Sequence, residues 1–209
     1  MKYRLLTLAT LTFLTAPLMA ATSWPVRPGA DLTFLISPGY HSFLTDAYDD
    51  VTGGYGWVGG DFGLLIRAND RLSFQPKIAG YFNSLKLKSG FGGSEETYTN
   101  TLGVPALGVK YALYQGETLE FDINGELGVP LISSDLPGLT MKGDGVEFAI
   151  SGGLRFNKSL DIQLGYNYVP IKVTPDYVPS SAFFGSPSNL TETKTYNFGG
   201  VFISAGYYF

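Results

Sequence analysis

The most regular feature of the sequence is an alternation of apolar residues with polar or small ones. In the segment Val146–Phe156 the apolar side chains share one parity, and the pattern resumes in Leu160–Tyr168 after a three-residue interruption. Successive side chains of a β-strand point to opposite faces, whereas a helix would place its apolar residues three and four positions apart. Each segment is therefore predicted to be a strand with one apolar face and one polar face.

Six more segments follow the same period, which brings the predicted strands to eight. They are Asp31–Ser37, Val58–Arg67, Leu72–Ala79, Leu107–Leu113, Leu119–Leu127 and Gly200–Phe209. Pro76 and Pro105 fit this pattern badly, because proline lacks the N–H that a strand ladder needs. We expect bulges or local strand ends at both prolines.

The connections between these strands alternate between short and long. Short turns lie around 68–70, 115–117 and 157–159, and long connections cover 38–55, 83–100, 132–144 and 172–194. Tight turns at one end and long loops at the other are typical of outer-membrane barrels. The pattern predicts an all-β fold, an eight-stranded antiparallel up-and-down transmembrane β-barrel with short periplasmic turns and four long extracellular loops.

A soluble eight-stranded calyx is the alternative, because its strands would also alternate with period two. It would carry its charges outside and its apolar residues inside, and parity alone does not separate the two folds. Three observations favour the membrane. The apolar phase carries almost no charge along any strand, nothing helical is recognised that would pack across a calyx, and the chain ends on an aromatic residue inside its last strand.

The composition excludes several kinds of binding site. Of the 209 residues 15% are charged, the formal net charge is −4, and there are no cysteines and one histidine. This balance excludes a basic nucleic-acid-binding face, disulfides, thiolate metal sites and a multi-histidine metal site. We therefore expect no cofactor, no metal and no nucleic-acid partner.

The N-terminal segment resembles a secretory signal peptide. Lys2 and Arg4 precede an apolar run over residues 5–14, and a small-residue exit follows that ends at Ala20. This arrangement is that of a cleaved signal peptide. The expected organisation is a signal peptide over 1–20 and a barrel domain over 21–209.

The last nine residues, Val201–Phe209, carry a resemblance to a known family. An aromatic terminus at Phe209 with Tyr207 two residues earlier resembles the C-terminal signal of bacterial outer-membrane β-barrels. Size and strand count are similar to the small OmpA-type and OmpX-type barrels. The resemblance implies a location in the outer membrane, contact with its lipid and lipopolysaccharide, recognition of Tyr207 and Phe209 by the barrel-insertion machinery, and a monomer.

The polar faces of the strands predict ion pairs inside the barrel. If each short turn is centred on a three-residue loop, strand residues pair antiparallel about that centre. Three oppositely charged pairs then face each other: Asp61 with Lys77, Lys110 with Asp122, and Arg155 with Asp161. Acids outnumber bases on this face, with Glu126 and Glu147 left over. Because an eight-stranded barrel is just wide enough for its interior side chains to fill it, we expect a plugged lumen.

The sequence leaves three functions open. The leading one is a non-enzymatic barrel that acts through its loops in adhesion, surface protection or envelope integrity, where a host or surface ligand would bind. The second is a narrow channel for small or apolar solutes. The third is a lipid A acyltransferase or deacylase, for which the lone His41 beside Ser42 and near Asp46 would be the candidate, although a solvated loop histidine is the simpler interpretation.

Overall fold

The computed structural model describes residues 26–48, 51–88, 95–176 and 190–209, so the predicted signal peptide lies outside the described residues. Along the chain the elements are β1 (Val26–Ile36), α2 (Pro38–Ala47), β2 (Val51–Gly53), β3 (Gly56–Arg67), β4 (Leu72–Lys88), β5 (Glu95–Gln115), β6 (Leu119–Gly128), β7 (Leu131–Ser134), β8 (Leu139–Gly143), β9 (Glu147–Phe156), β10 (Leu160–Tyr168), β11 (Pro170–Pro175), β12 (Lys194–Asn197) and β13 (Val201–Tyr208).

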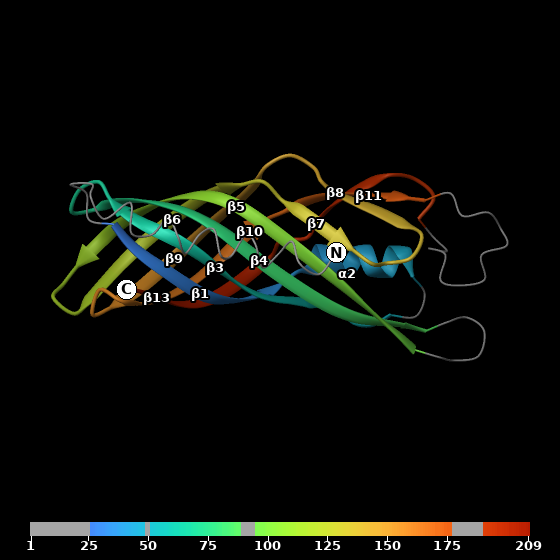
Figure 1. Cartoon of the computed structure of the whole chain (residues 1–209), viewed down its shortest axis with the longest axis horizontal. Helices are drawn as coiled ribbons and strands as arrows, with labels where there is room; N and C mark the ends of the chain where they lie inside the picture. The colour runs from blue at the N-terminus through green and yellow to red at the C-terminus, as the bar shows by residue number, and fades with distance from the viewer. Residues whose placement is uncertain (1–25, 49–50, 89–94, 177–189) are drawn as a thin grey trace.

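Eight of these strands form a closed barrel. The antiparallel order around the ring is β1-β3-β4-β5-β6-β9-β10-β13, and the pairing of β13 with β1 closes it. The predicted eight-stranded antiparallel barrel is confirmed. Figure 1 shows the barrel lengthwise, with the tight turns and the C-terminus at its left end and α2, β7, β8 and β11 at its right end. These are called the turn end and the loop end below.

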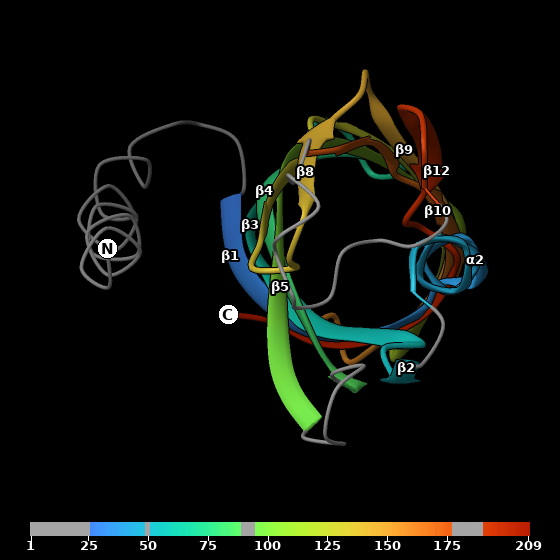
Figure 2. The ribbon, with the colours of Figure 1, turned by 90° about the vertical axis from the view of Figure 1, so that its right-hand side faces the viewer.

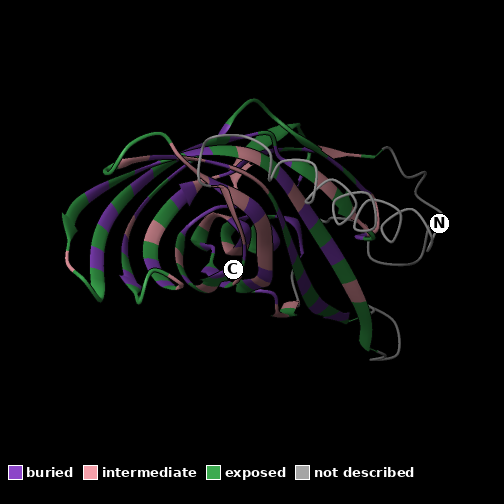
Figure 3. Cartoon of the chain, turned by 60° about the vertical axis from the view of Figure 1, so that its left-hand side comes forward, coloured by how far each residue is buried: buried purple, intermediate pink, exposed green. Residues whose placement is uncertain are grey.

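The alternation of the sequence appears as alternation of burial along each strand (Figure 3). Outward positions carry exposed apolar side chains such as Leu164, Ile150 and Leu32. Inward positions of the same strands carry buried polar or charged ones such as Gln163, Ser151 and Thr33. A surface of this kind is stable in hydrocarbon, because closure pairs the strand edges and the outer side chains are apolar.

The loop end is more ordered than the sequence predicted. The expectation of no helix is wrong, because α2 occupies most of the first long connection. Ser37 caps it, since its hydroxyl accepts a hydrogen bond from Tyr40 N at 3.1 Å, and Pro38 stands at its first turn, where a missing N–H costs nothing. Within the described residues no helix is long and apolar enough to cross a bilayer.

The second, third and fourth long connections also contain strand. β4 and β5 continue past the predicted strand ends and pair as far as Lys88 with Glu95. β7 lies beside β5, and β8, β11 and β12 form a three-stranded sheet above the barrel in the order β12-β11-β8. Figure 2, which looks onto the loop end, shows this additional structure around the mouth of the ring.

The two prolines do not end their own strands, so that expectation is wrong. Pro76 and Pro105 lie inside β4 and β5 and keep their register with Leu107 and Ile78. Their effect falls on the neighbouring strands. The pairing of β3 with β4 passes from Gly63↔Lys77 to Ile66↔Phe74 without a pair at Pro76, and β6 ends at Gly128, opposite Ala106. The register shift between β5 and β6 lies elsewhere, between Ala112 and Tyr114.

The closing seam between β1 and β13 carries an arginine clasp at the turn end. The Arg27 guanidinium donates to Tyr208 O at 2.9 Å, to Ser159 Oγ at 3.1 Å and to Phe209 O at 3.3 Å, and it also donates to Lys158 O. Phe209 N donates in turn to Pro28 O at 2.9 Å. One side chain of the first strand therefore holds the last strand and the turn between β9 and β10.

Candidate functional site

The lumen near the turn end is filled by a network of charges, which we call the turn-side ion network. It consists of three cations and three carboxylates on inward positions of five strands: Arg67, Lys110, Arg155, Glu120, Asp122 and Asp161. Lys110, Arg155, Asp122 and Asp161 are at most 2% exposed. Equal numbers of the two charges make this layer neutral, which is what allows it to be buried.

Arg155 and Lys110 join the carboxylates of this network. Arg155 reaches Glu120 Oε1 at 2.7 Å, Asp122 Oδ2 at 3.4 Å and Asp161 Oδ1 at 3.6 Å. Lys110 Nζ lies 2.7 Å from Asp161 Oδ2 and 3.6 Å from Asp122 Oδ2. Each cation therefore contacts carboxylates on more than one strand.

Tyr208 completes the packing of this layer. Its ring lies 5.0 Å from the Arg155 guanidinium carbon and 5.6 Å from Lys110 Nζ, and both cations face the aromatic π-system. The Tyr208 hydroxyl accepts a hydrogen bond from Gln75 Nε2 at 2.9 Å. The last strand of the barrel is therefore joined to the lumen charges through an inward aromatic residue.

A second group of charges, the central acidic cluster, lies one step closer to the loop end. Lys77 Nζ lies 2.7 Å from Asp61 Oδ2 and 2.9 Å from Glu126 Oε2. Asp31 Oδ1 accepts a hydrogen bond from Asp61 N at 3.2 Å. Glu147 is 4% exposed, and among the described residues its Oε2 has no hydrogen-bond partner. Four carboxylates surround one lysine here, so this layer carries an excess of negative charge.

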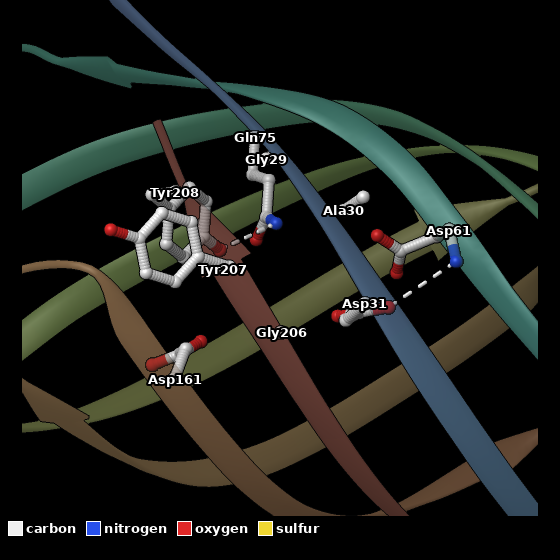
Figure 4. A pocket seen from close by; sticks show the side chains of 9 residues that line it. All are labelled: Gly29, Ala30, Asp31, Asp61, Gln75, Asp161, Gly206, Tyr207 and Tyr208. Atoms are coloured by element: carbon white, nitrogen blue, oxygen red, sulfur yellow. Dashed lines mark hydrogen bonds between the residues drawn. The ribbon is translucent and has the colours of Figure 1, made fainter.

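A narrow gap lies between the two groups, and Figure 4 shows the residues that line it. Asp31 and Asp61 line one side of it, and Gln75, Asp161 and Tyr208 line the other. Gly206 permits this packing, because a Cβ added there would lie 2.5 Å from the Cβ of Asp31. Among the described residues no group of His, Cys, Asp or Glu side chains has the arrangement of a metal site.

The side chains of all three predicted ion pairs meet in the lumen, one pair in the central acidic cluster and two in the turn-side ion network, but only one pair has the predicted register. Arg155 and Asp161 are directly opposed across the β9–β10 hairpin. Asp61 pairs with Ala79 instead of Lys77, and Lys110 pairs with Asn124 instead of Asp122. Both registers are displaced by two residues, and because side-chain direction repeats every two residues the charges still face the lumen.

Inside the barrel at the loop end, buried aromatic side chains pack against one another as part of a larger apolar cluster, and we call this aromatic group the loop-end plug. Tyr40 and Phe43 of α2 pack against Trp57 of β3 and Phe198, with the ring centroids of Tyr40 and Trp57 4.9 Å apart. All four side chains are at most 1% exposed. The sequence analysis missed this plug, although Tyr40, Phe43, Leu44 and Ala47 already have the spacing of one helix face.

Tyr40 shows that the plug reaches across the ring. It lies on the helix that follows β1, and its hydroxyl accepts a hydrogen bond from Asn100 Nδ2 on β5 at 2.7 Å. β5 lies three strands from β1 around the ring. Burial raises the pKa of Tyr40 above its ordinary value, so the phenol stays protonated and neutral in this apolar setting.

The residues of the enzyme alternative lie on α2 but do not form a catalytic arrangement. The Ser42 hydroxyl donates to Pro38 O at 3.1 Å, and the His41 ring lies 4.6 Å from the ring of Tyr55. Asp46 Oδ2 accepts a hydrogen bond from the Tyr196 hydroxyl at 3.0 Å. The contacts of these three residues are those of a capped and packed helix. None of the contacts described above joins Ser42, His41 and Asp46 to one another as a nucleophile, a base and an orienting acid.

Comparisons with known proteins give similarity in fold only. The sequence matches no protein-family model and no curated protein. Among solved structures it is similar to Ail, the attachment invasion locus protein of Yersinia pestis, solved in complex with the heparin analogue sucrose octasulfate. The identity is 11%, the TM-score is 0.40, and the match covers 90% of this chain and 100% of that chain. It is also similar to the outer membrane protein OprG from Pseudomonas aeruginosa, at 14% identity and a TM-score of 0.40, over 88% of this chain and 94% of that chain.

Proposed function

We propose that this protein is an integral outer-membrane β-barrel, neither an enzyme nor a channel, that acts at the cell surface through its loop end. Adhesion, surface protection and envelope integrity are the roles that such a protein serves. The observation that carries the proposal is the filled lumen, in which the ion networks occupy the turn side and the aromatic plug occupies the mouth. The apolar outer surface supports the membrane location.

Export and insertion belong to the same proposal. Residues 1–20 would direct secretion and be removed, and Tyr207 and Phe209 would be read by the insertion machinery. Both side chains are exposed on the outer face, with ring centroids 5.3 Å apart, where a partner reaches them. The barrel would work as a monomer in contact with outer-membrane lipid and lipopolysaccharide.

The decisive experiment combines location with conductance. The protein should fractionate with the outer membrane and migrate faster on gels when unheated than when boiled, and deleting Phe209 should reduce insertion. In planar bilayers the purified barrel should show no steady ionic conductance, and lipid A from expressing cells should keep its mass. Steady conductance would favour the channel alternative. A change in lipid A mass that His41→Ala abolishes would favour the enzyme.

A further inference from the structure

The outer face of the three-stranded sheet carries two lysines in direct opposition. Lys142 of β8 and Lys172 of β11 are cross-strand partners, and both are exposed, whereas Met141 and Val173 beside them are buried on the other face. Directly opposed residues of an antiparallel pair have their Cβ atoms about 4.5–5.5 Å apart, and like charges in that position destabilise the sheet. The surface of this sheet therefore carries two positive charges side by side, at a cost to the stability of the sheet.

Neither ammonium group is neutralised within the described part of the chain. The structure gives Lys142 and Lys172 no ion pair and no side-chain hydrogen bond there. Asp144 and Asp176 each accept a hydrogen bond from a threonine, Asp144 Oδ2 from Thr195 Oγ1 at 2.6 Å and Asp176 Oδ1 from Thr140 Oγ1 at 2.8 Å, and neither carboxylate forms an ion pair with the two lysines. The lysine pair is therefore available to an external anion.

The height of the pair above the barrel indicates which anion it meets. Phe148 of β9 and Tyr168 of β10 stack on the outer face with ring centroids 5.4 Å apart, and aromatic residues of this kind mark the interface of a membrane barrel. Lys172 follows Tyr168 by four residues, which is roughly 13 Å along an extended chain. β8 and β11 lie on the loop-end side of β9 and β10 (Figure 1), so the lysines are beyond this aromatic level, on the side where the headgroups of a surrounding bilayer would lie.

We propose that Lys142 and Lys172 bind the phosphate groups of the glycolipid in the outer leaflet and so fix the loop-end sheet against the membrane surface. This inference rests on the proposed function, because it needs the loop end to face the outer leaflet. The chemistry is that of a bisphosphorylated glycolipid meeting two adjacent ammonium groups, with the acyl chains lying along the apolar outer face of β9 and β10. The site then couples the surface sheet to the lipid around the barrel.

The test measures stabilisation of the purified full chain by lipid A in detergent. Bisphosphorylated lipid A should raise the thermal midpoint of the wild type, because a ligand that binds only the folded barrel stabilises it. The K142Q/K172Q variant should bind lipid A ~30-fold more weakly, since each lysine near an anionic surface contributes about 1 kcal/mol. K86Q/K88Q is the matched control, because it removes two exposed lysines from the loop end of β4, away from the three-stranded sheet, and should bind like the wild type.

Three outcomes would overturn the inference. They are equal stabilisation of K142Q/K172Q and wild type, equal stabilisation by lipid A whose phosphates have been removed, and stabilisation by a soluble sulfated polysaccharide but not by lipid A. K142R/K172R should restore binding, and fast migration of the unheated variants checks that they fold. A failure here leaves outer-membrane fractionation and the absence of conductance intact, so it is distinguishable from a failure of the proposed function.

Discussion

At the scale of single residues, the lumen depends most on Lys110. Its Nζ is 2.7 Å from Asp161 and 3.6 Å from Asp122, and the side chain is 2% exposed. Lys110→Met should lower the free energy of unfolding by about 3 kcal/mol, because it leaves buried carboxylates short of a cation. Denaturant unfolding in detergent measures the change.

Lys86→Met is the matched control for this prediction. Lys86 pairs with Glu95 at 3.4 Å, but its side chain is 54% exposed, so its loss should cost less than about 1 kcal/mol. Equal losses in the two variants would show that the lumen pairs are as well solvated as the surface pair.

The central acidic cluster gives a second prediction, in which substitution of two glutamates in the same cluster has different effects on stability. Glu147→Gln should leave the barrel equally stable or raise its stability by about 1 kcal/mol, because it removes a buried charge whose Oε2 has no partner. Glu126→Gln should lower stability, because Glu126 Oε2 lies 2.9 Å from Lys77. Comparison of the thermal midpoints at neutral pH tests this prediction. A larger fall in the midpoint for Glu147→Gln than for Glu126→Gln would contradict it.

At the scale of elements, the position of α2 is controlled by one close approach. A Cβ added at Gly39 would lie 2.0 Å from the backbone carbonyl oxygen of Asn197, so Gly39→Ala should push the helix away from the mouth. Trp57, which packs on Tyr40, should then emit at longer wavelength, measured in a Trp24→Phe background. Gly80→Ala is the control, because nothing lies within 4 Å of its added Cβ, and an unchanged spectrum in both variants would count against the plug.

The strands were predictable from the sequence because one face of each carries buried polar side chains and the other carries exposed apolar side chains. Val146–Phe156 and Leu160–Tyr168 alternate without ambiguity, and Asn157 and Lys158 both take positive φ in the turn between them. α2 was missed although its capping serine and apolar spacing are present. Its ten residues stand in a long connection rich in polar residues. What stabilises the helix is packing against Trp57 of the next barrel strand and against Phe198, which is distant in sequence.

The ion pairs were partly predictable for a different reason. Strand parity places Asp61, Lys77 and Lys110 on the inner face, and the observed register displacements of two residues preserve that face. Parity does not give contacts across the ring. Arg155 and Glu120 are directly opposed on the neighbouring strands β9 and β6, which are joined by a long connection and not by a tight turn. The short contact of Lys110 with Asp161 joins β5 to β10 and depends on the stagger set when the barrel closes. Closure is a property of all eight strands together.

At the scale of the whole molecule, two barriers lie in series along the barrel axis. The ion networks block the turn side and the aromatic plug blocks the mouth, so removing one should leave the other in place. Tyr40→Ala/Phe43→Ala and Lys77→Ala/Lys110→Ala/Glu126→Ala/Arg155→Ala, which removes side chains from both ion layers, should each be silent in planar bilayers, and the combined variant should show steady conductance. Migration of unheated protein on gels confirms that each variant is folded, and conductance in either partial variant would show that its remaining barrier does not seal.

The arginine clasp at the seam has a consequence for the order of events in folding. Gly29 pairs with Tyr208, so the seam joins segments at opposite ends of the barrel sequence, and the entropy of closing so long a loop delays this contact until the hairpins have formed. A contact that forms after the transition state affects the rate of unfolding more than the rate of folding. Arg27→Ala should therefore accelerate unfolding severalfold in lipid vesicles while refolding keeps its rate. The clasp would then act as a kinetic latch, which prolongs the lifetime of a finished barrel without having helped to build it.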